Sequence, residues 1–391
     1  MPKIISKNKI SNINNFADAL GIPIAYIDSV VNLSDDDKYT DPKKIAFKKD
    51  GKIRVIKCPS SRIRKIQSRI NTRIFKDLIQ WPEFIYGSIP NSDDGEVEIK
   101  KDYISCASRH CEARSLLKMD ISDFFSNVHE HFVYDLFKNL FNYDDELCNY
   151  LVSLCCYKGR LVQGALTSSY IASLILWDVE SELVKRLNRL QLVYTRLVDD
   201  ITVSAKISKY KFDIAEHHIK EMLFSKDLPI NEKKTSVSYN SSSPLMVHGL
   251  RVSFKTPRLP SDEVRRIRSA VQSLELLFKE PNYNTSYGYR KDYQKCMGRV
   301  NKLARVKHEK HSILMNRLKK IKPKSSIIDV KISYRILNKL KKDYQSKKDM
   351  FWYKKQYWKL IDRVNFISKS FPIEAKKIRA EAKKISPPEC Y

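Results

Sequence analysis

The sequence predicts an α+β fold in which an antiparallel sheet presents a cluster of carboxylates and a helical, basic region follows it. In the stretch 194–204, apolar and β-branched residues flank Asp199 and Asp200 on both sides, a pattern typical of strand, tight turn and strand. The stretch 116–120 reads as an apolar strand that ends in a carboxylate. Beyond Pro260, apolar residues recur at helical spacing and lysine becomes frequent, which predicts helices.

The composition favours a protein that binds a polyanion. The chain has 391 residues, of which 42% are hydrophobic, enough for a substantial core in more than one lobe. Its formal net charge of +28 favours nucleic acid as a partner, because phosphate neutralisation supplies much of nucleic-acid affinity. A basic surface on an anionic membrane is the alternative. No apolar run approaches the length of a membrane span and the first residues are polar, so we expect a cytoplasmic protein without membrane contact.

The cysteines do not indicate a structural metal site. The chain has eight, and none belongs to a paired CxxC array. Cys106, His110 and Cys111 cluster, but a fourth ligand at the spacing of a zinc finger is absent. Reduced thiols are therefore the favoured interpretation.

Periodicity predicts the remaining elements. Residues 1–44 predict helices broken at Gly21, and residues 45–56 alternate around Gly51, which predicts a β-hairpin. Between 62 and 75, isoleucines share one face of a predicted helix that also carries several arginines. Further helices are predicted over 129–141, 167–187, 206–226 and 264–278.

Asp120 and the Asp199–Asp200 pair point to phosphoryl-transfer chemistry. Ionised carboxylates side by side are costly in a neutral interior, and bound divalent cations turn that cost into a site. Transfer assisted by two metals needs carboxylates from separate strands that converge on ions about 3.5–4 Å apart. The order and context of these stretches, with Gln163 and Gly164 between them, are those of a polymerase palm. Taken alone, the pair would instead favour an exposed Asp-Asp hairpin.

Taken in order, these stretches resemble the consecutive motifs of a prokaryotic reverse transcriptase, and most of all those of the retron and abortive-infection (phage-defence) branches. The similarity covers roughly residues 45–320, and an ordered set of motifs is far more specific than any one of them. The matching segments are Asp120 with Phe124-Phe125, 161–168 ("LPQGAPTS"), 197–200 ("YxDD"), 231–235, the turn at 247–250, 62–67, and 107–110 ("NAxxH").

The resemblance implies a right-hand polymerase of fingers, palm and thumb, with an antiparallel palm sheet and a helical C-terminal thumb. It implies an N-terminal helical segment at 1–44, fingers at 45–112, a palm with a fingers insertion at 113–253 and a thumb at 254–323. Residues 324–391 form a basic helical extension in this scheme. Its aromatic–lysine stretch at 351–359 suits either RNA stacking or an amphipathic helix that packs on the thumb or on a partner.

The resemblance also implies the site residues. Asp120, Asp199, Asp200 and Lys234 would be catalytic, with Lys234 protonating the leaving pyrophosphate. Two Mg²⁺ ions would be held by Asp120, the carbonyl of Ile121, Asp199 and Asp200. Phe125 would lie beneath the sugar of the incoming nucleotide and disfavour a 2′-hydroxyl. The nucleotide would contact Arg54, Arg62, Phe125, Gln163 and Gly164, and the primer and template would contact Leu197, Val198, His248, Gly249, Arg299 and Lys302.

Four positions depart from the family pattern. Leu197 replaces the tyrosine of the "YxDD" box, so the bulk that braces the primer end is kept and the hydroxyl is lost. Val162 and Leu166 replace two prolines but leave the Gln163-Gly164 pair intact. His248 stands where retron enzymes usually have threonine. Because the carboxylates are all present, we expect an active enzyme.

The resemblance implies an RNA-directed DNA polymerase that makes cDNA from a cognate structured non-coding RNA in anti-phage defence. Its partners would be that RNA, the RNA/DNA hybrid and dNTPs; an effector protein and an oligomeric state are left open. One alternative is a template-independent or protein-primed DNA polymerase of the abortive-infection type. The other is an RNA-binding scaffold that restrains a toxic effector, towards which only Leu197 points.

Overall fold

The computed structural model describes residues 1–5, 10, 12–42, 46, 47, 51, 53–93 and 98–388. Residues 45, 48–50 and 52 of the predicted 45–56 hairpin lie outside the described residues, and the described part pairs as β3 (Ala46–Phe47) and β4 (Ile53–Arg54). The chain forms two compact units, residues 1–258 and 259–391. No helix in the described part of the chain has the length and apolar character of a membrane span.

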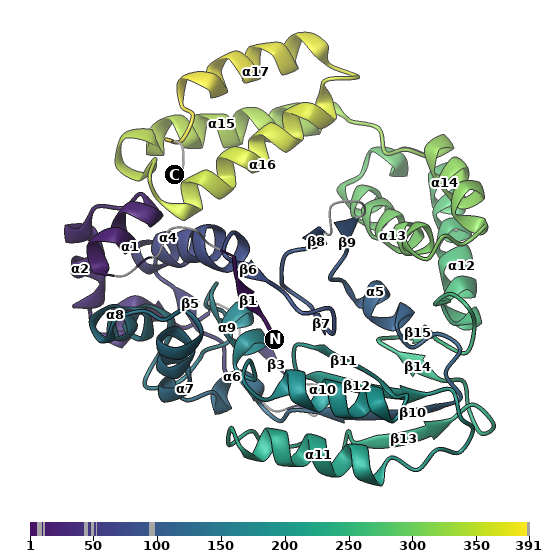
Figure 1. Ribbon diagram of the computed structural model, residues 1–391. Helices are drawn as coiled ribbons and strands as arrows, with labels where there is room; N and C mark the ends of the chain where they lie inside the picture. Colours follow the sequence, from purple (N-terminus) through teal and green to yellow (C-terminus); the bar gives the residue numbers. More distant parts are fainter. Residues whose placement is uncertain are drawn as a thin grey trace. The chain divides into compact units, whose positions relative to one another are not determined.

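The first unit contains a five-stranded sheet (Figure 1). Its strand order is β13-β10-β12-β11-β7, with every neighbouring pair antiparallel except β11 and β7. The predicted antiparallel sheet is therefore confirmed, apart from the parallel edge strand β7. The strands are β7 (Ile85–Tyr86), β10 (Ser115–Asp120), β11 (Val193–Leu197), β12 (Asp200–Ala205) and β13 (Ser236–Tyr239).

The central strands are held by burial on both faces. Leu116 and Leu117 of β10 are fully buried, and they point to opposite faces because side chains alternate along a strand. Helix α10 (Glu180–Arg189) contacts both β11 and α11 (Asp213–Phe224), and Figure 1 shows α10 and α11 alongside the sheet. These helices thereby hold in place the strands whose ends carry the carboxylates.

Helices cover the rest of the first unit. The predicted break after the first helix is confirmed: α1 ends at Gly21, whose φ of +61° closes it with a left-handed cap. The helices and π-helical turns are α1 (Ile13–Leu20), α2 (Ile24–Val31), α3 (Asp35–Lys38), α4 (Ser61–Ile70), η1 (Asn71–Lys76), α5 (Tyr103–Ser108), α6 (Phe124–Asn127), α7 (Glu130–Asp135), η2 (Leu136–Leu140), α8 (Asp145–Cys155) and α9 (Ser168–Leu174). The short strand pairs are β1 (Lys3–Ile4) with β6 (Ile79–Gln80), β2 (Tyr39–Thr40) with β5 (Cys58–Pro59), β8 (Ser92–Asp93) with β9 (Glu98–Ile99), and β14 (Met246–Val247) with β15 (Leu250–Arg251).

Two predicted helices are wrong in extent. The helix predicted over 167–187 is interrupted between α9 and α10, at residues 175–179. The helix predicted over 206–226 begins only at Asp213. The residues before it are held out of helix by Ser115, whose hydroxyl donates to the carbonyl of Ile207 at 2.7 Å and accepts from the amide of Tyr210 at 3.0 Å.

The second unit is helical, as predicted. Helices α15 (Ile327–Lys347), α16 (Phe351–Ile367) and α17 (Pro372–Lys384) share a core that includes Leu337, Tyr353 and Ile378. The stretch 351–359 lies in α16 with Tyr353 buried and Trp358 63% exposed, so this helix is amphipathic. The other elements are α12 (Ser261–Lys279), η3 (Tyr283–Thr285), α13 (Tyr287–Arg305) and α14 (Lys310–Lys320).

Candidate active site

The sheet brings the three predicted carboxylates together. Asp120 ends β10 and lies directly opposite Asp200, the first residue of β12. Asp199 occupies the two-residue turn between β11 and β12, and its carbonyl accepts the amide of Ile121 at 3.0 Å. The strand register therefore fixes residues from distant parts of the chain at one edge of the sheet.

The turn that carries Asp199 has an unusual backbone. Val198 has a φ of +60° at the first central position, where a two-residue hairpin turn usually has glycine. A β-branched residue in this region costs about 1–3 kcal/mol and persists only when its surroundings impose it. One constraint is Gly87 in the neighbouring segment, where a Cβ would lie 2.8 Å from a methyl group of Val198.

A buried ion pair supplies the other constraint. The Arg196 guanidinium and the Glu180 carboxylate are 0% and 2% exposed and form two hydrogen bonds, of 2.6 and 2.7 Å. Arg196 also donates to the carbonyls of Val198 at 3.1 Å and Ser173 at 2.8 Å. The hydroxyl of Tyr194 donates to Glu180 at 2.8 Å. The pair thus ties α10 and the end of α9 to the carboxylate turn.

The carboxylates carry more negative charge than their surroundings neutralise. Burial raises the pKa of Asp199, with a further contribution from Asp120, while the charges of Lys234 and Arg54 oppose the shift. Burial, together with the charges of Asp199 and Asp120, raises the pKa of Asp200 to about 6. A divalent cation would relieve this repulsion, so the donor set fits the metal that the chemistry requires.

Lys234 and Asn231 bracket Asp120. The ammonium of Lys234 lies 2.9 and 2.8 Å from the two carboxylate oxygens, and its hydrogen bond to Asp120 raises the pKa of Lys234. The amide of Asn231 donates to the backbone carbonyl of Asp120 at 2.8 Å, and its side chain donates to the carboxylate at 3.3 Å. The 231–235 segment therefore positions the first carboxylate, a role of Asn231 that sequence reasoning missed.

The described residues form no closed metal cage. Within the described ranges, no three His, Cys, Asp or Glu side chains are grouped so that they could hold a metal ion by themselves. A Mg²⁺ ion that works on a nucleotide is normally held by one or two carboxylates, with waters and substrate phosphates as its other ligands. An open set of three carboxylates is compatible with that mode of binding.

The loop at 161–168 is anchored to the segment before α4. The amide of Lys57 donates to the carbonyl of Gln163 at 3.0 Å. Gly164 has a φ of +117°, and a Cβ there would lie 2.2 Å from the carbonyl oxygen of Lys57. Only glycine permits this approach. The buried amide of Gln67 accepts from Leu166 at 3.0 Å and donates to the hydroxyl of Tyr39 and the carbonyl of Leu154.

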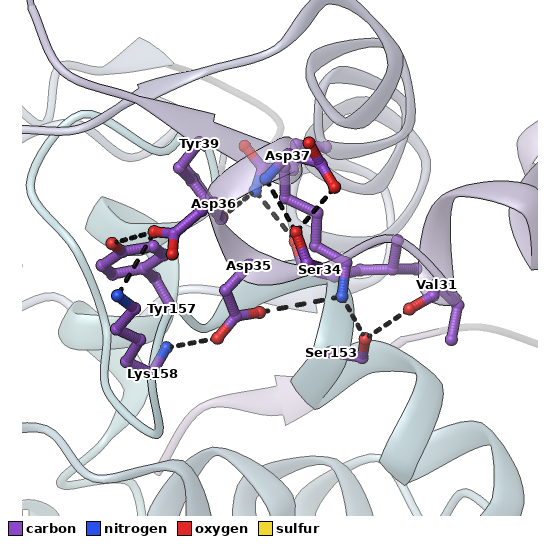
Figure 2. A network of polar contacts seen from close by, with 12 residues as sticks. Val31, Ser34, Asp35, Asp36, Asp37, Tyr39, Ser153, Tyr157 and Lys158 are labelled. Carbon is purple, nitrogen blue, oxygen red and sulfur yellow. Dashed lines mark hydrogen bonds and ion pairs between the residues drawn. The ribbon is translucent and has the colours of Figure 1, made fainter.

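Helix α3 contacts the segment that precedes this loop (Figure 2). Asp36 accepts the hydroxyl of Tyr157 at 2.7 Å and forms an ion pair with Lys158 at 3.3 Å. Asp35 accepts the amide of Lys158 at 2.7 Å, and Lys38 donates to Ser153 at 2.7 Å. The acidic first residues of α3 therefore hold the residues just before the Gln163-Gly164 loop. Sequence reasoning assigned no role to α3.

The predicted nucleotide contacts are only partly assembled. Arg54 is exposed on β4, close enough for its charge to act on Asp199. Arg62 is exposed on α4, where its charge acts on the phenol of Tyr26, and no described interaction links it to the carboxylates. Phe125 is half-buried against the core.

The predicted primer and template contacts lie in both units. Leu197 pairs with Asp200 in the hairpin, and His248 and Gly249 form the β14–β15 turn with φ of +46° and +79°. His248 lies 3.8 Å from the Asp200 carboxylate, and burial lowers its pKa to about 4. Arg299 and Lys302 are exposed on α13 of the second unit.

Comparison with known proteins identifies the family. A family model described as "Reverse transcriptase (RNA-dependent DNA polymerase)" matches residues 46–298, more than half of the chain. The "Retron Ec48 reverse transcriptase" of Escherichia coli is 46% identical over 354 residues, which are 90% of this chain and 86% of that protein. This chain belongs to the retron-type reverse transcriptases.

A further relative of this reverse transcriptase is the "Retron Se72 reverse transcriptase" of Salmonella heidelberg, 31% identical over 270 residues, or 68% of each chain. Among solved structures, an apo telomerase from Candida tropicalis is 10% identical and covers 90% of this chain and 71% of that one, with a TM-score of 0.42. The family model and the two retron relatives confirm the predictions of a prokaryotic reverse transcriptase and of an RNA-directed DNA polymerase.

Acid is expected to weaken the affinity of the reverse transcriptase for divalent metal ions. The carboxyl of Asp200 has a pKa of about 6 in the free enzyme, so below that pH its proton must leave before a metal binds. The apparent affinity should fall about tenfold for each pH unit below that pKa. Mg²⁺ titrations of the initial rate between about pH 8 and pH 5 measure this effect. A half-saturating Mg²⁺ concentration that stays constant over this range would contradict the assignment.

Gly164→Ala is expected to lower kcat/KM for dNTPs about a hundredfold, because the loop must move away from Lys57 and misplacement of about 1 Å is enough for such a loss. Gly21→Ala is the matched control: φ there is +61°, but nothing lies within 4 Å of an added Cβ. The Gly21→Ala variant therefore has the cost of a side chain at positive φ without a steric clash. Equal losses of activity in the two variants would show that the Lys57 contact is unimportant.

Proposed function

We propose that this reverse transcriptase copies a cognate structured non-coding RNA into DNA by phosphoryl transfer at two Mg²⁺ ions. The observation that carries the proposal is the strand register that places Asp120 opposite Asp200, with Asp199 in the adjoining turn. Carboxylates from separate strands that converge on one point are what two-metal transfer requires. The net charge of +28 suits an enzyme that holds a long polyanion.

The chain's own residues take distinct parts in this reaction. Asp120, Asp199, Asp200 and the carbonyl of Ile121 would hold the ions, which lower the pKa of the primer hydroxyl and neutralise charge at the phosphorus when bound. Lys234 keeps its proton because Asp120 raises its pKa. From this position beside Asp120, Lys234 would protonate the departing pyrophosphate.

The other assigned residues hold the substrates. Arg54 and Arg62 would bind the triphosphate, and Gln163 and Gly164 would pack against the nascent base pair. Leu197, Val198, His248 and Gly249 would hold the primer end. Arg299 and Lys302 on α13 would follow phosphates of the duplex without reading its sequence. The domain boundaries inferred from the resemblance belong to this proposal.

Phe125→Ala is expected to raise the use of ribonucleotides relative to deoxynucleotides by about tenfold or more, because a ring beneath the sugar excludes a 2′-hydroxyl. The measurement is the ratio of kcat/KM for matched rNTP and dNTP substrates. Phe132→Ala is the control, since Phe132 is also half-buried against the same core. An unchanged ratio in the Phe125 variant would remove Phe125 from the nucleotide site.

The biological setting that we propose is anti-phage defence. In this setting the primer is a 2′-hydroxyl of the cognate RNA, and the product is a branched RNA–DNA. The support is the identity of 46% to the Retron Ec48 reverse transcriptase across 90% of the chain.

Incubation of the purified protein with labelled dNTPs, Mg²⁺ and its co-purified RNA tests the proposal. A DNA product whose synthesis is abolished by prior RNase treatment is expected. Label that stays with protein after nuclease digestion would favour protein-primed synthesis instead. No incorporation at all would favour an RNA-binding scaffold that restrains an effector protein.

A further inference from the structure

A continuous chain of polar side chains runs through the interior of the first unit to the Asp200 carboxylate. Four of its members are at most 3% exposed, and the side chain of His248 is 12% exposed. We call these five residues the relay: Ser204, His110, Thr195, Cys106 and His248. They come from β12, β11, α5 with the turn after it, and the β14–β15 turn.

The contacts along the relay are short. His110 has Nδ1 at 2.7 Å from the hydroxyl of Ser204 and Nε2 at 2.7 Å from the hydroxyl of Thr195. The thiol of Cys106 lies 3.2 Å from the same threonine hydroxyl and 3.3 Å from Nε2 of His248. Nδ1 of His248 faces the Asp200 carboxylate at 3.8 Å. Each member thus contacts the next.

The last contact gives the relay a direction, which the tautomer of His248 tests below. An ionised carboxylate only accepts hydrogen bonds, so the order that serves Asp200 has the proton on Nδ1 of His248. Nε2 of the neutral ring then accepts, and the Cys106 thiol must donate to it. The hydroxyl of Thr195 is left to donate to the sulfur.

The same logic carries to the far end of the relay. Because the hydroxyl of Thr195 donates to Cys106, its oxygen accepts from Nε2–H of His110. Nδ1 of His110 then accepts from Ser204. This order needs a protonated Cys106 thiol and a neutral His110 imidazole. Burial favours both forms, because it raises the pKa of Cys106 to about 12 and lowers the pKa of His110 to about 3.

We propose that the relay positions Asp200, by presenting the Nδ1–H of His248 to its carboxylate and so holding that carboxylate ready for a metal. The proposal rests on the function proposed above for Asp200. It makes Cys106 and His110 positioning residues, although neither lies within hydrogen-bonding distance of Asp200. A separation of 3.8 Å is longer than a hydrogen bond, and such contacts in a free enzyme commonly tighten in the working complex.

A purely structural role would not need this arrangement. Buried polar groups are costly unless each finds a partner, and an apolar core would fill the same space at lower cost. Each member of the relay has a hydrogen-bonding partner within it. Nδ1 of His248 has none there and faces the Asp200 side chain, which is 51% exposed. Groups that orient a metal-ligating side chain typically change metal affinity about 10- to 100-fold when removed.

The tautomer of His248 tests the relay without reference to metal binding. In ¹⁵N-histidine-labelled full-length protein at about pH 8, above the pKa of Asp200, the ¹⁵N shifts of the imidazole report which nitrogen carries the proton. Loss of a signal in His248→Asn assigns the resonance. The relay predicts the neutral Nδ1–H form. An Nε2–H form, or an imidazolium, would overturn it.

Mn²⁺ affinity, measured by electron paramagnetic resonance without nucleic acid, tests the role of the relay. Cys106→Ala should weaken binding about tenfold or more, because His248 loses the donor that orients it. Cys106→Ser, which keeps a donor, should restore most of that loss. Cys148→Ala is the matched control, a fully buried cysteine whose thiol donates to the carbonyl of Tyr143.

The outcomes separate the relay from the proposed function. Unchanged Mn²⁺ affinity in Cys106→Ala, or an equal loss in Cys148→Ala, would overturn the relay. Binding by Asp199→Asn as tight as by the unaltered protein would overturn the metal assignment itself. In that case the tautomer of His248 still decides whether the relay exists. The proposal that the relay positions a metal ligand would be overturned together with the metal assignment.

Discussion

Asp199→Asn is expected to lower the rate of DNA synthesis about a thousandfold or more. Asparagine keeps the size of the side chain but removes the charge that would hold the metal in the proposed mechanism. A bound ion supplies several kcal/mol of transition-state stabilisation, and about 4 kcal/mol corresponds to a thousandfold in rate. Initial rates of labelled dNTP incorporation on a primed RNA template measure the effect. Synthesis within a few-fold of the unaltered enzyme would contradict the assignment of Asp199.

The same variant is expected to fold at least as well as the unaltered enzyme. Because the pKa of Asp199 is raised in the folded state, its charged form destabilises the fold above that pKa, and the penalty disappears as the pH falls towards the unfolded value. Asp199→Asn should therefore raise the unfolding temperature of the metal-free protein near pH 8. Asp227→Asn is the control, since Asp227 is exposed and also lies in a turn with positive φ.

Arg196→Met is expected to destabilise the first unit by about 3–5 kcal/mol, because it leaves the Glu180 carboxylate buried without its partner. Thermal or denaturant unfolding measures the loss. Arg317→Met is the control, since it breaks an ion pair of similar geometry with Glu275 that is partly exposed. Its cost should be about 1 kcal/mol or less. Equal losses in the two variants would contradict the view that burial decides the effect.

A double variant separates stability from catalysis. Arg196→Met combined with Glu180→Leu should recover most of the stability, because replacing both members of a buried pair with apolar residues is often neutral or better. DNA synthesis should stay impaired, since the carbonyl of Val198 has lost the donor that holds the Asp199 turn. Full recovery of both would show that the pair serves the fold alone.

The parts of the site that could be predicted are those with local patterns. Asp120 ends an apolar strand, and the Asp199–Asp200 turn lies between two alternating strands. Placing these strands in one sheet was enough to predict that the three carboxylates lie close together. The Gln163-Gly164 loop was assigned to the nucleotide by resemblance, and its close approach to the carbonyl of Lys57 was not predicted.

The parts that could not be predicted depend on tertiary contacts. Arg196 lies in a strand, and nothing in its neighbours indicates that its partner is Glu180 of a preceding helix. The same arginine accounts for the helix break that was missed. It satisfies the carbonyl of Ser173 in the last turn of α9, where the chain has no glycine or proline to end the helix. His248 was assigned to the primer by resemblance, and its contact with Cys106 has no sequence signal.

Iron-mediated cleavage tests the central claim, that Asp120, Asp199 and Asp200 share a divalent-metal site. Fe²⁺ placed in the Mg²⁺ site and supplied with ascorbate and peroxide generates radicals that cut the nearby backbone. We expect cuts confined to the segments around residues 120 and 199, competed away by Mg²⁺ and absent in Asp199→Asn. Cuts elsewhere, or none above the metal-free background, would contradict the account.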